Sequence, residues 1–93
     1  MAAGVKFHPD VVEKDLPRID NRIYKQILTA IEERLVQSSP LHGKPLQKSL
    51  HGCRRLRIGN FRVVYKYYPE KDLILIVAIR HRSEVYAFAE KRL

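Results

Sequence analysis

Five residues in the second half of the chain are of the types that hold phosphate and stack on nucleic-acid bases. They are Arg55, Arg57, Arg62, Arg80 and Tyr86. A guanidinium group binds phosphate oxygens through two parallel hydrogen bonds, and an aromatic ring stacks on an unpaired base. Clustered guanidinium groups repel one another, so their convergence would indicate a phosphate site. The alternative is that each arginine lies along a sheet with its head in water.

Strand periodicity decides whether these side chains meet. A period of two predicts strands over 53–58 and 61–68, joined by a tight turn at Gly59-Asn60. A third strand is expected over 73–79, where the residues are continuously apolar, as in a strand covered on both faces.

Alternation along these strands brings the arginines together. Arg55 and Arg57 share one face, and the tight turn places Arg57 beside Arg62. The third strand runs antiparallel to the second, so Arg80 is level with Arg62. Tyr86, in a short final helix capped by Ser83, overhangs the same corner.

The first half supplies the scaffold. Residues 5–7 alternate like a short strand, and a helix begins near Pro9 and breaks near Pro17. Asp20 or Asn21 caps a second helix, in which apolar residues recur every four positions until Ser38-Ser39-Pro40 ends it. Residues 41–51 show no period and are expected to form a loop. The pattern predicts an α+β domain in which a helical hairpin packs on a twisted, mainly antiparallel sheet with a three-strand meander.

Composition limits the class of protein. The chain has 93 residues, which is one small domain spanning 1–93, and a net charge of +8. Residues 1–43 are balanced in charge, so the whole excess lies in 44–93 and favours a polyanionic partner. The longest apolar run, 73–79, is far shorter than the roughly 20 residues of a membrane span. We therefore expect a soluble, cytoplasmic protein with no membrane partner.

The C-terminal half resembles the RelE branch of the RelE/ParE toxins, the toxin halves of type II toxin–antitoxin pairs. The segments that carry the resemblance are CRRLRI at 53–58, NFRVVY at 60–65 and IRHRSEVY at 79–86. The second is shared across the wider superfamily, and the third is close to RelE itself. The predicted order of elements also matches, so the resemblance implies the RelE-like microbial RNase fold over nearly the whole chain.

The resemblance implies a ribosome-dependent mRNA endonuclease that cuts A-site codons and arrests growth by inhibiting translation. A 2′-hydroxyl attacks its own 3′-phosphate and leaves a 2′,3′-cyclic phosphate, with no metal and no other cofactor. Arg55 and Arg62 match phosphate-binding positions, Arg57 the general base, Arg80 the general acid and Tyr86 the base-orienting aromatic. The implied partners are the ribosome, its mRNA, and a small acidic, helical antitoxin.

One departure concerns the general base. The family's two lysines are Arg55 and Arg57 here, and arginine stays protonated and cannot accept a proton. The resemblance assigns the base to Arg57, and the alternatives are His81 or no side chain at all. Replacing Arg80 or Tyr86 by alanine is expected to remove toxicity without unfolding the protein.

Other residues and other functions remain open from the sequence. Further RNA contacts are expected at Lys44, Lys48, Arg54 and Arg82 unless these form only a solvated face. The scattered histidines show no metal-ligand spacing. The alternatives are a ParE-like toxin that poisons DNA gyrase without nuclease activity, or a silent module that binds only antitoxin or RNA.

Overall fold

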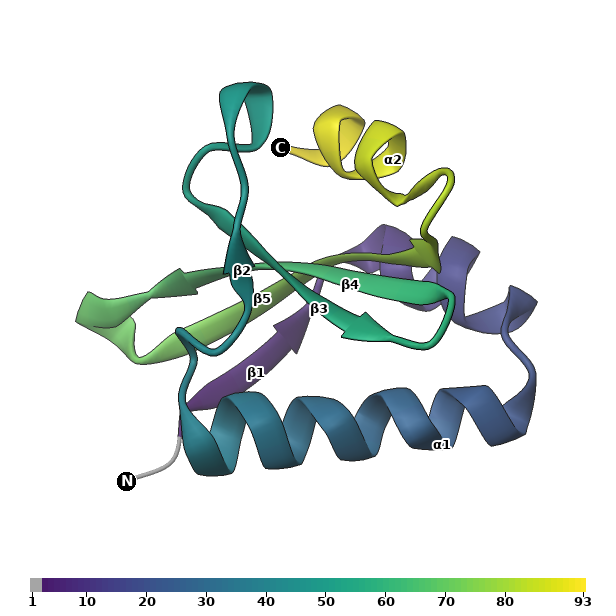
Figure 1. The fold of residues 1–93 in the computed structure, drawn as a ribbon, viewed down its shortest axis with the longest axis horizontal. Coiled ribbons are helices and arrows are strands. Elements are labelled where there is room, and N and C mark those ends of the chain that lie inside the picture. The colour runs from purple at the N-terminus through teal and green to yellow at the C-terminus, as the bar shows by residue number, and fades with distance from the viewer. Residues whose placement is uncertain (1–2) are drawn as a thin grey trace.

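The computed structural model describes residues 3–93, which form one five-stranded sheet with helices on both faces (Figure 1). The spatial order is β1-β5-β4-β3-β2, with β1 parallel to β5 and every other pair antiparallel. The strands are β1 (Gly4–Phe7), β2 (Lys44–Pro45), β3 (Cys53–Ile58), β4 (Phe61–Tyr68) and β5 (Leu73–His81). The predicted α+β class and its C-terminal meander are confirmed.

The N-terminal helices pack against one face of the sheet. A π-helical segment (Val11–Asp15) leads into a 3-10 turn (Leu16–Arg18) that contains Pro17, where the sequence predicts a break. The helix α1 (Asn21–Ala30) then continues as a π-helical segment (Ile31–Ser38). Asp20 caps α1 by accepting a hydrogen bond from the Arg22 amide at 2.8 Å, which confirms one of the two predicted caps.

The sheet separates two hydrophobic clusters. On the α1 face, Ile27, Ile31 and Leu35 pack against Ile74 and Ile76. On the opposite face, the C-terminal helix α2 (Val85–Arg92) packs against another cluster, which includes Leu50, Cys53, Val64, Val77 and Ala78. Strand β5 contributes to both clusters, as its continuous apolar run predicts.

The hairpin between β3 and β4 turns through Gly59 and Asn60. Ile58 pairs with Phe61, so the loop has two residues, and Gly59 has φ +58°, which favours glycine. The β4–β5 register shifts at Val64/Tyr65 by one bulge, after which Tyr65 pairs with Ile76. The hairpin is the element that fixes the spacing of the arginines.

Two local predictions are wrong. Residues 41–51 are not all loop: β2 pairs with β3, and Lys48–Leu50 forms a 3-10 turn. Ser83 does not cap α2; its hydroxyl lies 2.8 Å from His81 Nδ1, and Glu84 occupies the cap position without a capping hydrogen bond. In residues 3–93 no helix is long and apolar enough to cross a membrane.

Candidate active site

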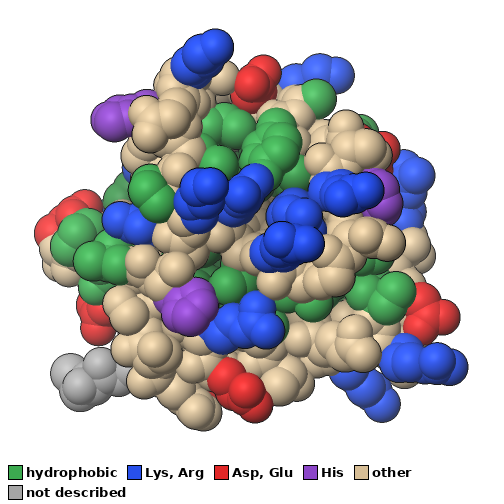
Figure 2. Space-filling model, viewed as in Figure 1, with side chains coloured by type: hydrophobic (Ala, Val, Ile, Leu, Met, Phe, Trp, Pro, Cys, Tyr) green, Lys and Arg blue, Asp and Glu red, His purple; other side chains and the backbone are tan. Residues whose placement is uncertain are grey.

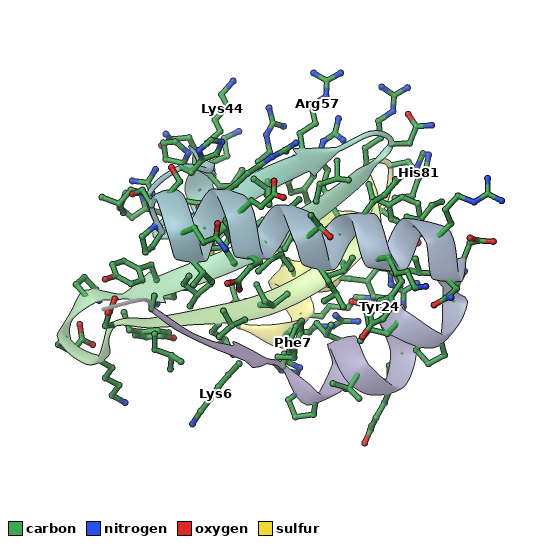
Figure 3. All side chains as sticks on the ribbon, turned by 90° about the horizontal axis from the view of Figure 1, so that it is seen from below. Lys6, Phe7, Tyr24, Lys44, Arg57 and His81 are labelled. Atoms are coloured by element: carbon green, nitrogen blue, oxygen red, sulfur yellow. The ribbon has the colours of Figure 1, made fainter. Side chains whose placement is uncertain are left out.

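The register of the meander places three arginines in one row. Arg57 on β3 is the Cα partner of Arg62 on β4, which in turn is the partner of Arg80 on β5. Arg55 lies two residues from Arg57 and so on the same face. Lys and Arg side chains gather on this side of the molecule (Figure 2), and Figure 3 shows Arg57 and Lys44 projecting together. The backbone register therefore aligns Arg57, Arg62 and Arg80 as the alternation predicts.

Arg62 is buried, as is Arg80 in the same row. Arg62 is only 7% exposed. Its Nη1 donates to the carbonyl oxygens of Gly59 at 2.9 Å and Phe61 at 2.8 Å. Burial lowers the pKa of Arg62, and the positive charges of Arg57, Arg55 and Arg82 lower it further, against an opposing effect of Tyr86. A charge held in this way is stabilised when an anion arrives.

Tyr86 joins the row from the other side. It lies in the first turn of α2, and its hydroxyl accepts a hydrogen bond from Arg55 Nη1 at 2.9 Å. The contact links β3 to α2 across 31 positions in the sequence. Tyr86 is half-buried, so part of its ring is open to a ligand.

Arg82 completes the group, although the sequence indicates it only as a peripheral RNA contact. Its amide donates to Asn60 O at 2.8 Å, which holds the end of β5 against the hairpin turn. We refer to Arg55, Arg57, Arg62, Arg82 and Tyr86 as the arginine cluster. In residues 3–93 the cations that form ion pairs are Lys14, Arg80 and Arg92 alone, so the cluster arginines have no carboxylate partner there.

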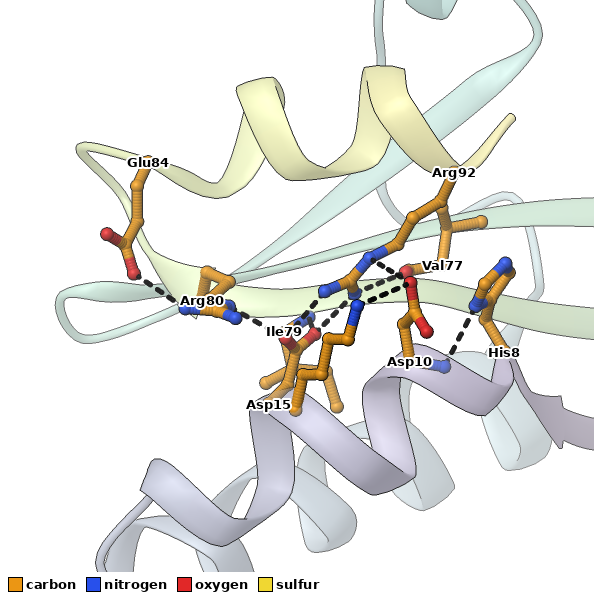
Figure 4. A network of polar contacts seen from close by, with 9 residues as sticks. His8, Asp10, Asp15, Val77, Ile79, Arg80, Glu84 and Arg92 are labelled. Carbon is orange, nitrogen blue, oxygen red and sulfur yellow. Dashed lines mark hydrogen bonds and ion pairs between the residues drawn. The ribbon is translucent and has the colours of Figure 1, made fainter.

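The side chain of Arg80 differs from the others. Its Nε donates to Asp15 Oδ1 at 2.7 Å, and Nη1 donates to Glu84 Oε1 at 3.3 Å (Figure 4). Its guanidinium carbon lies 3.8 Å from the centroid of the Phe88 ring. Arg80 is thus engaged in a buried ion pair, and replacing it by alanine would remove a partner of a buried carboxylate. We therefore expect the alanine variant to be less stable than the unaltered protein, whereas the sequence predicts only a loss of toxicity.

Asp15 is the centre of that network and carries no signal in the sequence. Its carboxylate accepts hydrogen bonds from Arg92 Nη1 at 2.7 Å, Arg92 Nη2 at 2.9 Å and the Ile79 amide at 2.9 Å, besides the bond from Arg80. Burial alone would raise the pKa of Asp15, but the bonds from Arg92, Ile79 and Arg80 outweigh it, and the pKa lies below 3.8. Asp15 therefore ties the N-terminal helical segment to β5 and α2.

The remaining predicted residues lie at the margins. Lys44 is exposed on β2, opposite Arg55, and Lys48 is exposed on the 3-10 turn. Arg54 holds the preceding loop, because Nη1 donates to Gly43 O at 2.8 Å and Leu41 O at 3.2 Å. His81 is exposed, with its ring engaged by Ser83. No group of three potential metal ligands occurs in the described part of the chain.

The loop before β2 is held tightly against the sheet at Gly43. Its amide donates to the buried Tyr65 hydroxyl at 2.8 Å, and that hydroxyl donates to Pro40 O at 2.8 Å. A Cβ at position 43 would lie 2.5 Å from Tyr65 Oη and 2.6 Å from Arg55 O. Backbone and a buried ring cannot both move aside, so this position requires glycine.

Gly43→Ala is expected to lower the free energy of unfolding by about 1–3 kcal/mol because of this overlap. Urea denaturation followed by circular dichroism measures it. Gly4→Ala is the matched control, since its Cβ would meet Leu73 Cδ1 at an ordinary 3.8 Å. Equal stability of the two variants would contradict the close approach at Gly43.

Comparisons with known proteins agree with this architecture. The family model described as the ParE toxin of the type II toxin–antitoxin system parDE matches residues 5–86. Toxin RelG of Mycobacterium tuberculosis is 27% identical over 73 residues, covering 78% of this chain and 84% of RelG. The mRNA interferase toxin RelE of Escherichia coli is 27% identical over 77 residues, covering 81% of this chain and 77% of RelE.

Solved structures show the same fold. The toxin–antitoxin complex RelBE2 of M. tuberculosis contains a chain that superposes with a TM-score of 0.78 at 28% identity, covering 88% of this chain and all of that one. Free E. coli RelE, with two arginines replaced by alanine, superposes with a TM-score of 0.79 at 21% identity, covering 100% and 99%. The latter likeness concerns the fold alone.

Proposed function

The chain belongs to the ParE toxin family of type II toxin–antitoxin systems and to the RelE branch of the RelE/ParE superfamily, and on that premise we propose that it is a ribosome-dependent mRNA endonuclease. The observation that carries the proposal is the arginine cluster. Four guanidinium groups without a carboxylate partner in residues 3–93 gather on one face of the sheet, and one of them is buried. Beside them lies Tyr86, whose hydroxyl is hydrogen-bonded to Arg55.

The proposed reaction is a transesterification within the RNA strand. The 2′-hydroxyl oxygen forms a bond to the adjacent phosphorus, the bond to the 5′-oxygen breaks, and that oxygen takes up a proton. Negative charge builds on the phosphorane oxygens, where fixed cations are most effective. Arg62 and Arg55 have the burial and the hydrogen-bonded positions to supply this stabilisation, and Tyr86 supplies the ring that orients the base.

The arginines are poorly suited to transfer the protons of this reaction. Arg57 remains protonated and cannot act as a base, and His81 is tied to Ser83 on an exposed turn. The contacts of Arg80 with Asp15 and Glu84 favour a positioning role over that of a general acid. We therefore propose that charge stabilisation and orientation account for most of the rate enhancement, with the 2′-hydroxyl proton passing to solvent.

We propose an antitoxin and the ribosome as the partners. The related M. tuberculosis chain is described in a toxin–antitoxin complex, and the net charge of +8 here favours an acidic partner segment. The same basic surface favours ribosomal RNA, where binding weakens steeply with added salt because counterions are released.

Purified protein added to ribosomes programmed with a short mRNA is expected to cut in the A-site codon, and only when ribosomes are present. Primer extension maps the cuts. Tyr86→Ala is expected to lower the cleavage rate about 5- to 150-fold, because base stacking contributes roughly 1–3 kcal/mol. Arg22→Ala, on the exposed surface of α1, is the control and should cut normally. Absence of cuts with the unaltered protein would overturn the proposal.

A competing proposal follows from the resemblance to ParE toxins, the name that the matching family model bears: the chain would poison DNA gyrase. It predicts no RNA cleavage and inhibition of DNA supercoiling by the purified protein. A supercoiling assay on the sample used for primer extension separates the two. Cuts on the ribosome without loss of supercoiling would exclude the ParE-like activity.

A further inference from the structure

A basic groove of about 220 Å³ opens beside the arginine cluster, along the edge of the sheet formed by β2 and β3. Its cationic lining comes from Arg34 of the π-helical segment that continues α1 (Ile31–Ser38), Lys44 of β2, and Arg55 and Arg57 of β3. His42 also lines it. No carboxylate of residues 3–93 is part of this lining. Arg55 and Arg57 belong to both the groove and the cluster, so the two are continuous.

The walls of the groove are fixed by contacts that need no ligand. Tyr65 and Arg54 hold the loop through Pro40, Gly43 and Leu41. On the opposite side Arg34 Nη1 donates to Arg57 O at 3.0 Å, which ties the π-helical continuation of α1 to β3. The groove is therefore preorganised, and a ligand would not have to order this loop.

The charges in the groove are not explained by the stability of the fold. Lys44 and Arg55 are direct partners across the β2–β3 pair, and like charges in that position destabilise a sheet. Neither residue, nor Arg34 or Arg57, forms an ion pair within the described residues. Such an arrangement is stabilised by a bound anion.

We propose that this groove binds a second phosphate of the RNA strand, adjacent along the chain to the phosphate held at Arg62. The inference rests on the proposed function. The continuity through Arg55 and Arg57 favours RNA over an acidic peptide, because a phosphodiester strand presents regularly spaced charges to both places at once. Arg34 and Lys44 are the residues that belong to the groove without belonging to the cluster.

The test uses a fluorescent trinucleotide of 2′-O-methyl RNA, which lacks the attacking hydroxyl, and measures its binding by anisotropy without ribosomes. The double variant Arg34→Gln/Lys44→Gln is expected to weaken binding about tenfold at low salt. The slope of log affinity against log salt should fall by about 0.7 for each phosphate that the protein no longer neutralises. A nucleoside 3′-monophosphate is short enough to occupy the cluster alone. Its affinity, measured by competition, should therefore be the same for the double variant and the unaltered protein.

The matched control is Arg22→Gln/Lys25→Gln, which removes the same charge from exposed positions on α1 outside the groove. An equal loss of affinity in the control would show that only the net charge of the protein matters, and would overturn the proposal. An equal loss of affinity for the monophosphate would also overturn it, as would a larger loss for a polyglutamate peptide than for the trinucleotide. Binding is read without cleavage, so a failure of the endonuclease proposal leaves this result interpretable.

Discussion

Asp15→Ala lowers the free energy of unfolding by about 3–5 kcal/mol, the expected cost of breaking a buried ion pair from one side. Asp15 is 1% exposed and accepts hydrogen bonds from Arg80, Arg92 and the Ile79 amide. Without it, the Arg92 guanidinium keeps Val77 O, at 3.0 Å, as its hydrogen-bond partner and loses its nearest anion. This is a large fraction of the roughly 5–15 kcal/mol that stabilises a small domain.

Urea denaturation measures the effect, and Asp10→Ala is the control. Asp10 Oδ2 lies 3.7 Å from Arg92 Nε and is partly exposed, so its loss should cost less than about 1 kcal/mol. A denaturation midpoint for Asp15→Ala equal to that of the unaltered protein would contradict the role of the network.

Lowering the pH should reduce the difference in unfolding free energy between Asp15→Ala and the unaltered protein. The pKa of Asp15 lies below its ordinary value of 3.8 in the folded protein, because its three partners outweigh the effect of burial. A carboxyl of this kind contributes stability above its ordinary pKa and loses it as the pH falls through the folded-state value. Unfolding curves at pH 7 and at successively lower pH, down to about pH 3, should therefore show the two proteins converging.

Arg62→Ala lowers the rate of cleavage on programmed ribosomes by about 10²–10³-fold, the usual effect of removing one group that stabilises transition-state charge. The fold should tolerate the change, because burial and the charges of Arg57, Arg55 and Arg82 disfavour the charged form of Arg62, as its lowered pKa shows. Its bonds to Gly59 O and Phe61 O lie at a hairpin turn, where water can replace them. A change in unfolding free energy within about 1 kcal/mol is expected.

Single-turnover cleavage separates this effect from binding. Arg62→Lys retains the charge but not the planar fork, so its rate should lie between those of the alanine variant and the unaltered protein. Arg22→Ala again serves as the control. Cleavage by Arg62→Ala at the normal rate would remove Arg62 from the proposed site, whatever the outcome for Tyr86.

Periodicity predicts the parts of the fold that depend on local sequence. The alternation in β3 and β4 and the glycine turn set the Arg57–Arg62–Arg80 row before any tertiary contact is known. Strand β2 cannot be predicted in this way, because two residues, one of them Pro45, show no period. The predicted cap at Ser83 is wrong because its hydroxyl is engaged with His81 at 2.8 Å, a local alternative to capping.

The partners of the arginines are beyond prediction from alternation. Alternation gives the face from which a side chain leaves a strand, but not the direction in which a long guanidinium group turns. Arg80 turns to Asp15 and Phe88, and Arg82, two residues later, stays with the cluster. Asp15 could not be identified from the sequence, because its partners are 64, 65 and 77 positions away and its neighbours are those of an ordinary helical carboxylate.

Those separations bear on the order in which the molecule can fold. Strand β1 pairs only with β5, and the Asp15 carboxylate is satisfied only when both β5 and α2 are in place. Contacts between such distant segments form late, since closing long loops costs entropy before any contact compensates for it. The same docking of α2 brings Tyr86 to Arg55. A folding intermediate with α2 detached therefore lacks the two hydrogen bonds from Arg92 to Asp15 and the contact between Tyr86 and Arg55, so the proposed site is complete only once α2 has docked.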